Sequence, residues 1–276
     1  MPTNLDNGFA SQSGSLVGRM AAPSWVIPAN LAENVLFLAG KTDEVGLCLF
    51  ETQACCAYGP DDIPPSLANL PLRWHVHLPL DLPWNAQTNI SARSALDIMD
   101  RVTFLKPRLA VLHPPEGQPA VQRRLLSAFF QCWHQETDIP LVLENTEYCD
   151  LTSLGTSFLK EHGAGMCLDV GHLLGYDQQR LLASDLPEQA VLLHWSAPGD
   201  HDRHLPLTAL TPPQRRIVSD LATRLSPSAT HMIEVFHWSG YVASLPVLAQ
   251  ILHFPDEVTK VKGAGVHDHF RHNETR

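Results

Sequence analysis

Eight short apolar segments recur along the chain, and longer stretches with apolar residues every three or four positions separate most of them. Short apolar runs are typical of strands buried on both faces, and the longer periodicity is typical of amphipathic helices. Eight strands alternating with helices predict an α/β fold, a (β/α)8 TIM barrel. The expected strands are Ser15–Gly18, Val45–Phe50, Trp74–Leu78, Leu109–His113, Leu141–Glu144, Met166–Asp169, Val191–Trp195 and Met232–Phe236. The expected helices are Ala29–Ala39, Ala92–Leu105, Ala120–His134, Leu151–Glu161, Gln178–Ser184, Pro213–Leu225 and Tyr241–Phe254.

The main alternative fold is a doubly wound open sheet. No G-x-G-x-x-G follows the first expected strand, and the sequence contains no Walker A loop. A chain of 276 residues fits one barrel, which we expect at residues 15–262 as a single domain. Residues 1–14 and 263–276 are expected to be flexible tails, the second containing His267, His269 and His272.

Six successive expected strands end in histidine, aspartate or glutamate. In a barrel of this kind the active site lies at the carboxyl ends of the strands, so these side chains are expected to meet there. The residues at these ends and in the loops after them are His75, His77, His113, Glu144, Asp169, His172, His194, Asp202, His204 and Glu234.

Imidazole and carboxylate groups in this number indicate a metal site. Several carboxylates can share one cavity when cations neutralise them, and the mixture suits Zn²⁺, Mn²⁺ or Fe²⁺. With one of His75 and His77 counted, nine ligands are too many for one ion, so we expect two or three metals. The identity of the metal stays open, because such sites accept several divalent ions.

The motifs that carry these residues resemble the endonuclease IV branch of the xylose isomerase-like TIM barrels, over roughly Trp74 to Trp238. The matching segments are His113-Pro114, Leu143-Glu144-Asn145-Thr146, Cys167-Leu-Asp169-Val-Gly-His172 with Leu174-Gly175-Tyr176-Asp177, Asp202-Arg203-His204, and Ile233-Glu234. The family binds three zinc ions. The resemblance implies one metal on His77, His113 and bridging Glu144, a second on Glu144, Asp169, His194 and Glu234, and a third on His172, Asp202 and His204.

The implied reaction is hydrolysis of a phosphodiester. Paired metals lower the pKa of water and stabilise both oxygens of an in-line displacement, so no side chain has to serve as nucleophile. We expect Glu144, Asp169 and Glu234 to be the catalytic carboxylates. His75 lies one pleat before His77 and is the other possible ligand, or a residue that binds substrate. Glu51 after the second strand could orient water, or could simply be exposed.

The sequence also departs from the endonuclease IV pattern. The first strand lacks the family's histidine, Pro114-Pro115-Glu116 replaces a small Gly-Ser turn, and Leu205-Pro206-Leu207 replaces a glycine-rich segment. With 19 Lys and Arg against 29 Asp and Glu, the formal net charge is −10. Binding to nucleic acid, which requires basic phosphate contacts, is therefore not expected.

Aromatic residues surround the expected metal ligands instead and suit a flat, weakly charged substrate. The segments from His75 to Trp84 and from Glu234 to Trp238 resemble the cobamide-remodelling phosphodiesterases of this superfamily. That resemblance implies hydrolysis of the nucleotide-loop phosphodiester of adenosylcobamides, giving a cobinamide phosphate and the lower-ligand riboside. The expected substrate-binding residues are His75, Trp84, Tyr176, Trp195, Arg203 and Trp238, with Tyr148 and Phe236 in the same aromatic set.

Other functions remain open at this point: an abasic-site DNA endonuclease, a sugar isomerase or epimerase with one metal, and a non-catalytic binding module. In an isomerase, Glu144 and Glu234 could transfer the proton, which would leave His113, His172 and His204 unexplained. The six cysteines form no C-x-x-C pair, which favours reduced thiols and a cytoplasmic protein. No apolar stretch reaches the length of a transmembrane helix.

Overall fold

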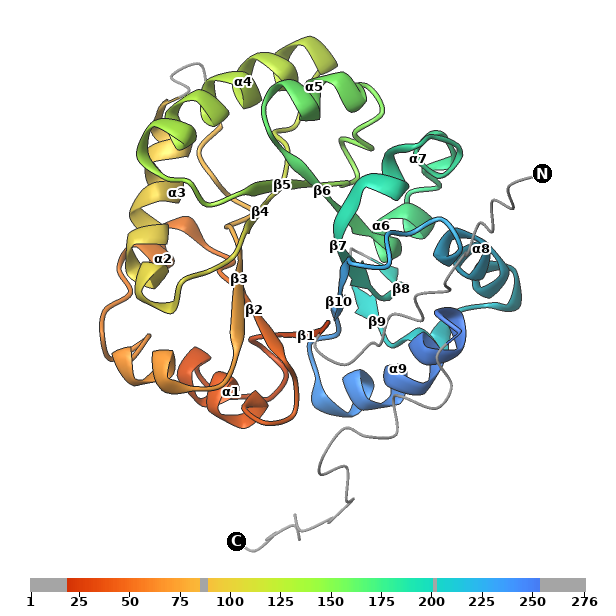
Figure 1. Cartoon of the computed structure of the whole chain (residues 1–276), viewed down its shortest axis with the longest axis horizontal. Coiled ribbons are helices and arrows are strands. Elements are labelled where there is room, and N and C mark those ends of the chain that lie inside the picture. Colours follow the sequence, from red (N-terminus) through yellow and green to blue (C-terminus); the bar gives the residue numbers. More distant parts are fainter. Residues whose placement is uncertain (1–18, 85–88, 201–202, 254–276) are drawn as a thin grey trace, which may run out of the picture.

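The computed structural model describes residues 19–84, 89–200 and 203–253. Eight parallel strands close into a barrel in the order β1-β10-β7-β6-β5-β4-β3-β2. Figure 1 looks down the barrel, with the helices forming an outer ring. The expected (β/α)8 TIM barrel is thus confirmed, as one domain. The barrel strands are β1 Met20–Pro23, β2 Glu44–Cys48, β3 Arg73–His77, β4 Ala110–Leu112, β5 Leu141–Glu144, β6 Gly165–Asp169, β7 Ala190–Trp195 and β10 Thr230–Ile233.

Nine α-helices lie in the described part of the chain. They are α1 Leu31–Leu38, α2 Thr52–Cys56, α3 Asn89–Val102, α4 Pro119–Glu136, α5 Gly155–Glu161, α6 Val170–Gly175, α7 Gln179–Ala183, α8 Pro212–Ala222 and α9 Trp238–Ile251. Capping boxes begin α1 at Asn30 and α8 at Thr211, each with a glutamate or glutamine three residues later. Among the described helices, none combines the length and apolar character that crossing a membrane requires.

The first strand differs from the expectation. Ser15–Gly18 lies outside the described residues, and the strand that closes the barrel is Met20–Pro23, paired with both β10 and β2. Ala21 and Ala22 are fully buried at this junction. Small residues fit where strands crowd together, but alanine has low strand propensity, so the apolar pattern did not indicate this strand.

Two short elements near the barrel mouth were also not expected. Helix α6 starts directly after β6, because Asp169 ends the strand and caps the helix by accepting a hydrogen bond from the His172 N–H. A hairpin of two short antiparallel strands, β8 Ala197–Pro198 and β9 His204–Leu205, follows β7. The predicted tails, residues 1–14 and 263–276, lie outside the described residues.

Along each strand, successive side chains point alternately into the barrel interior and towards the helices, and both regions are apolar. The outward residues join the helices in the main core, whereas a smaller cluster fills the barrel interior. The interior cluster is Ala21, Leu109, Val111, Val142, Cys167, Leu192 and Met232. Four polar residues each stand two positions after a member of this interior cluster: Glu144, Asp169, His194 and Glu234. They therefore also face inward, at the carboxyl ends of the strands.

Candidate metal centre

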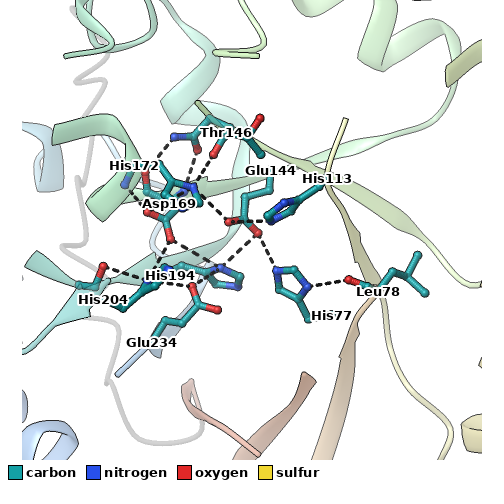
Figure 2. Close-up of polar contacts among 12 residues, drawn as sticks. His77, Leu78, His113, Glu144, Thr146, Asp169, His172, His194, His204 and Glu234 are labelled. Carbon is teal, nitrogen blue, oxygen red and sulfur yellow. Dashed lines mark hydrogen bonds and ion pairs between the residues drawn. The ribbon is translucent and has the colours of Figure 1, made fainter. Parts of the chain in front are cut away.

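Glu144 lies at the centre of a group of histidines (Figure 2), of which His77, His172 and His194 are buried and His113 is partly exposed. Its Oε2 is 3.1 Å from His77 Nε2 and 3.3 Å from His194 Nδ1. Its Oε1 is 3.4 Å from His113 Nε2 and 3.5 Å from His172 Nδ1. One carboxylate thus contacts imidazoles from four elements, as a bridging ligand would.

Two further carboxylates extend the group. Glu234 Oε2 lies 2.9 Å from His194 Nδ1 and 3.6 Å from His204 Nδ1. Asp169 Oδ2 lies 3.9 Å from the Nδ1 atoms of both His194 and His204. Asp169 and His194 are direct partners on adjacent strands, which explains their proximity.

Five sets of residues have ligand atoms within 4.8 Å of one another. Two of them regroup these residues, one with the addition of Cys167, and the other three contain all eight described candidate ligands. These three sets overlap at Glu144 and at Asp169, so they form one continuous polar centre. They are His77 with His113 and Glu144; Glu144 with Asp169, His194 and Glu234; and Asp169 with His172 and His204. Eight of the nine ligands expected from sequence therefore lie together, and the ninth, Asp202, is outside the described residues.

Hydrogen bonds fix two of the imidazoles in orientations suited to metal binding. His77 Nδ1 donates to the Leu78 carbonyl at 3.0 Å, and His172 Nδ1 donates to the Asn145 carbonyl at 2.8 Å. Each Nε2 then carries the lone pair. His77 Nε2 lies within hydrogen-bond distance of Glu144 Oε2, so a protonated His77 donates to both acceptors, and a bound cation would take the place of the proton on Nε2. This arrangement of a backbone acceptor behind a ligating histidine is common at metal sites.

Several buried atoms of the centre make no hydrogen bond to the part of the chain that the structure describes: His113 Nε2, Asp169 Oδ2 and Glu234 Oε2. Buried polar atoms without partners are costly, and ion ligation satisfies them. Orphaned nitrogen and oxygen atoms facing one another are the donor set that Zn²⁺ or Mn²⁺ accepts. The residues therefore fit divalent metal ions.

The electrostatic field in the centre keeps Glu144 ionised. Burial alone would raise the pKa of Glu144, but the imidazoles of His194 and His113 hold it well below its usual value. Burial raises the pKa of Asp169 to about 6, against the lowering effect of His172 and His204. The raised pKa values of Asp169 and of His194 favour bound protons in the centre when no metal is bound, so metals and protons compete here.

A layer of polar residues supports the ligands, and their roles were not predicted from sequence. Asn145 Oδ1 accepts from the Asp169 N–H at 2.8 Å, and Asn145 Nδ2 donates to the Asp169 carbonyl and to Gln178 Oε1, both at 2.9 Å. Gln178 in turn donates to the Thr146 carbonyl at 2.7 Å. The available signal for this role was the position of Asn145 at a strand end, directly after Glu144 in the Leu143-Glu144-Asn145-Thr146 motif.

The β8–β9 hairpin positions His204. Ser196 Oγ lies 3.2 Å from His204 Nδ1, and Gly171 leaves room for this hydroxyl, because a Cβ at residue 171 would come within 2.2 Å of Ser196 Oγ. The hairpin therefore brings a loop histidine to the same centre as the strand residues.

His75 lies away from the centre, one layer deeper in the barrel. Its Nδ1 contacts Glu44 Oε1 at 2.6 Å, and Glu44 also pairs with Arg108 at 2.8 Å and Arg73 at 3.3 Å. His75 is fully buried. Facing inward like His77 but two residues earlier on β3, it belongs to a structural ion network and has no access to a substrate at the mouth.

Two cavities open beside the centre. One of about 630 Å³ is lined by Trp84, Tyr148 and Tyr176 together with His113 and His172. The other, about 390 Å³, is lined by Arg203 and His204 and shares Glu147, His172 and Tyr176 with the first. The expected substrate residues Trp84, Tyr176 and Arg203 thus lie where a substrate could reach them.

Two other expected substrate residues point elsewhere. Trp195 is fully buried, and its Nε1 donates to His231 Nδ1 at 3.1 Å on the helix side of the sheet. Since His194 faces the barrel interior, its neighbour must face outward. Trp238 begins α9 and packs against Phe37 and Tyr241. Glu51 is exposed at the start of α2.

No model of a protein family matches this chain, and no curated protein sequence matches it. Solved structures do match. The fold matches that of other TIM barrels, among them solved xylose isomerase-like TIM barrel proteins. A D-tagatose 3-epimerase-like protein has 15% identity and a TM-score of 0.63, covering 87% of this chain and 99% of its own. Endonuclease IV from Thermus thermophilus has 17% identity and a TM-score of 0.61, with 85% and 99% covered.

A third neighbour is the TTHB071 protein, also from Thermus thermophilus, solved after soaking with ZnCl2. It has 22% identity and a TM-score of 0.57, and the match covers 85% of this chain and 97% of that one. The neighbours thus include both an endonuclease and a sugar epimerase-like protein, so the likeness establishes the fold, and the function has to be argued from the site.

Proposed function

We propose that this chain is a metal-dependent phosphodiesterase that acts on a small, nucleotide-like phosphodiester. The observation that carries the proposal is the continuity of three ligand sets, which share Glu144 and Asp169. A site for one metal needs three or four ligands, whereas this centre gathers five histidines and three carboxylates. Two or three adjacent ions suit phosphoryl chemistry, in which both the attacking and the leaving oxygen need stabilising.

The proposed ligand sets follow the geometry. His77, His113 and Glu144 would hold one ion, and Glu144, Asp169, His194 and Glu234 a second. His172 and His204 would hold a third, with Asp169 from the described residues and Asp202 expected from sequence. When bound, these ions, Zn²⁺ or alternatively Mn²⁺ or Fe²⁺, would supply an activated water and stabilise charge at phosphorus.

The chain's own residues prepare the site for this reaction. Glu144, Asp169 and Glu234 are the proposed catalytic carboxylates. The Asn145 and Gln178 hydrogen bonds fix the Asp169 backbone, and the His172 N–H holds its Oδ1, so its Oδ2 is aimed at the centre. Apolar side chains of the barrel interior lie below Glu144 and His194 and exclude bulk water from that side of the site. Arg203 at the second cavity is a cation suited to a phosphate oxygen.

The proposed substrate is the nucleotide-loop phosphodiester of adenosylcobamides, which would yield a cobinamide phosphate and the lower-ligand riboside. The cavity beside Trp84, Tyr148 and Tyr176 supports this choice, because its volume of about 630 Å³ accommodates a nucleoside and its aromatic rings can stack on a flat base. The net charge of −10 argues against a nucleic acid substrate. We place the enzyme in the cytoplasm, since all six cysteines are free thiols.

The test compares three substrates on the protein loaded with Zn²⁺ or Mn²⁺: adenosylcobalamin, a duplex containing one abasic site, and a ketose sugar. We expect release of the riboside from adenosylcobalamin, detected by chromatography, and its loss with chelator. Cleavage of the duplex alone would make the chain a DNA endonuclease. Isomerisation of the sugar without any diester hydrolysis would make it a single-metal isomerase or epimerase.

A further inference from the structure

Three aromatic side chains lie in the loops that follow three adjacent strands, β10, β1 and β2. They are Phe236, Trp25 and Phe50, which we call the aromatic platform. The ring centroids of Trp25 and Phe50 are 6.2 Å apart, and those of Phe50 and Phe236 are 5.7 Å apart at an interplanar angle of 75°. The platform is therefore one connected surface at the carboxyl end of the barrel.

The platform continues into the candidate metal centre. Phe236 lies edge-on to His204 with centroids 5.5 Å apart, and His204 is 5.5 Å from His172, which is 5.5 Å from Tyr176. A row of rings thus crosses the barrel mouth from Trp25 to Tyr176, with two candidate metal ligands in the middle. The cavity beside Trp84 and Tyr176 lies at one end of this row and the aromatic platform at the other.

Core packing does not account for the two phenylalanines. Phe50 is 37% exposed and Phe236 is 36% exposed, although both rings are large and apolar. Trp25 is held beside Phe50, and its Nε1 donates to the Cys48 carbonyl at 2.8 Å. Exposed aromatic rings on a fixed base next to a reactive centre are typical of a surface that binds a flat ligand.

The charges around the platform also indicate the type of ligand. The loops at residues 24–30, 49–52 and 234–237 contain no lysine or arginine, and Glu51 is their exposed charged residue. Strands β1 and β2 provide none of the candidate metal ligands found among the described residues. This sector therefore suits an uncharged planar group and offers nothing to the phosphates of a nucleic acid.

We propose that the aromatic platform binds a planar, mainly apolar group on the second ester arm of the substrate. The inference rests on the proposed function and extends it: a phosphodiester bound beside His172 and His204 has one arm in the cavity beside Tyr176 and the other against Phe236. The enzyme then selects diesters with two bulky flat arms over diesters with one.

Binding of two probes tests this directly. Dibenzyl phosphate has two flat arms and benzyl methyl phosphate has one, and calorimetry on the metal-loaded protein measures both dissociation constants. We expect dibenzyl phosphate to bind at least tenfold more tightly to the native chain. The double variant Phe50→Ala with Phe236→Ala should lose this preference to within twofold while its affinity for benzyl methyl phosphate is unchanged.

The matched control is Phe104→Ala. Phe104 is also 37% exposed, but it lies in the 3-10 turn Thr103–Leu105 that precedes β4, at the opposite end of the barrel. This variant should keep the tenfold preference. Equal affinity of the native chain for the two probes, or a preference that survives in the double variant, would overturn the platform. Thermal unfolding of all three proteins checks that the variants fold.

Hydrolysis rates test the proposed function separately from ligand binding at the aromatic platform. Bis(4-nitrophenyl) phosphate and methyl 4-nitrophenyl phosphate report hydrolysis of diesters with two flat arms and with one. If neither is hydrolysed but dibenzyl phosphate binds through Phe50 and Phe236, the phosphodiesterase assignment fails and the platform stands. If both are hydrolysed and the double variant keeps the native rate ratio, the assignment stands and the platform fails.

Discussion

Glu144 is the residue on which the candidate centre depends most. Both of its oxygens face imidazoles at 3.1–3.5 Å, and it belongs to three of the five ligand sets. A neutral amide of the same shape would keep the packing but would lose the charge that holds two cations next to each other.

We therefore expect Glu144→Gln to fold normally and to lose hydrolysis by at least about a hundredfold, with at least one metal fewer per chain. Elemental analysis and initial rates measure these effects. The control Glu136→Gln changes an exposed residue at the end of α4 and should alter neither. Native activity in the Glu144 variant would remove the bridging role.

His231 gives a pH dependence that is separate from the metal ligands. Burial lowers its pKa to about 4, and its Nδ1 accepts a hydrogen bond from Trp195. The unfolded chain binds a proton at this histidine near its usual pKa of about 6.5, whereas the folded chain does not. The free energy of unfolding therefore falls as the pH drops from about 6.5 towards 4.

The variant His231→Gln should show a weaker fall. Between pH 7.5 and pH 5, the loss in unfolding free energy should be about 2 kcal/mol smaller than in the native chain, as measured by urea unfolding of the metal-free proteins. His134→Gln, at an exposed position on α4, should retain the native slope. An unchanged slope in the His231 variant would mean that this residue titrates normally in the fold.

At the scale of single elements, much of the architecture was predictable because each strand has a strong apolar signal. Seven of the eight expected strands overlap the observed ones. The strand that was missed, Met20–Pro23, contains small residues that are needed for packing but have little strand propensity. Helix α6 was missed for another reason: Asp169 ends a strand, caps a helix and faces the centre at the same time.

The candidate ligands were predictable because they stand at strand ends, which meet at one face of a barrel. The side chains around them depend on the two-residue alternation of each strand. His75 and Trp195 stand close to strand ends in the sequence. The alternation nevertheless places His75 one layer deeper in the barrel and turns Trp195 towards the helices. Gln178 and Ser196 come from connecting segments, whose conformation no strand pattern determines.

Gly46 on β2 shows how closely these layers are packed. A Cβ at this position would lie 2.6 Å from His75 Nε2 and 2.7 Å from Met232 Sδ. We expect Gly46→Ala to lower the free energy of unfolding by about 1–3 kcal/mol, the usual cost of overpacking. Gly59→Ala meets nothing within 4 Å and should cause no loss. Urea unfolding compares the two variants, and equal stability would show that β2 can shift.

For the whole molecule, the main question is how a chain of net charge −10 tolerates three carboxylates buried beside one another. Glu144, Asp169 and Glu234 share His194 as a near neighbour, and one imidazolium cannot neutralise all three. Bound cations would balance them, so metals at this centre would stabilise the barrel as well as serve the proposed reaction.

We expect chelation to lower the melting temperature by roughly 10 °C, since tight ligands contribute about 4 kcal/mol and each kcal/mol shifts a domain of this size by about 2–4 °C. Added Zn²⁺ or Mn²⁺ should restore it, with saturation at two or three ions per chain by elemental analysis. Saturation at one ion would contradict the multinuclear centre and would favour the sugar isomerase.

The order of the strands has a consequence for how the centre is made in the cell. The ligands begin at His77 and end at Glu234, and β1 at the start of the barrel pairs with β10 near its end. A ribosome must therefore release almost the whole barrel before the last carboxylate can reach its partners. Any metal would then be loaded after synthesis, and a chain that stalls before β10 would lack the carboxylate of Glu234 beside its histidines.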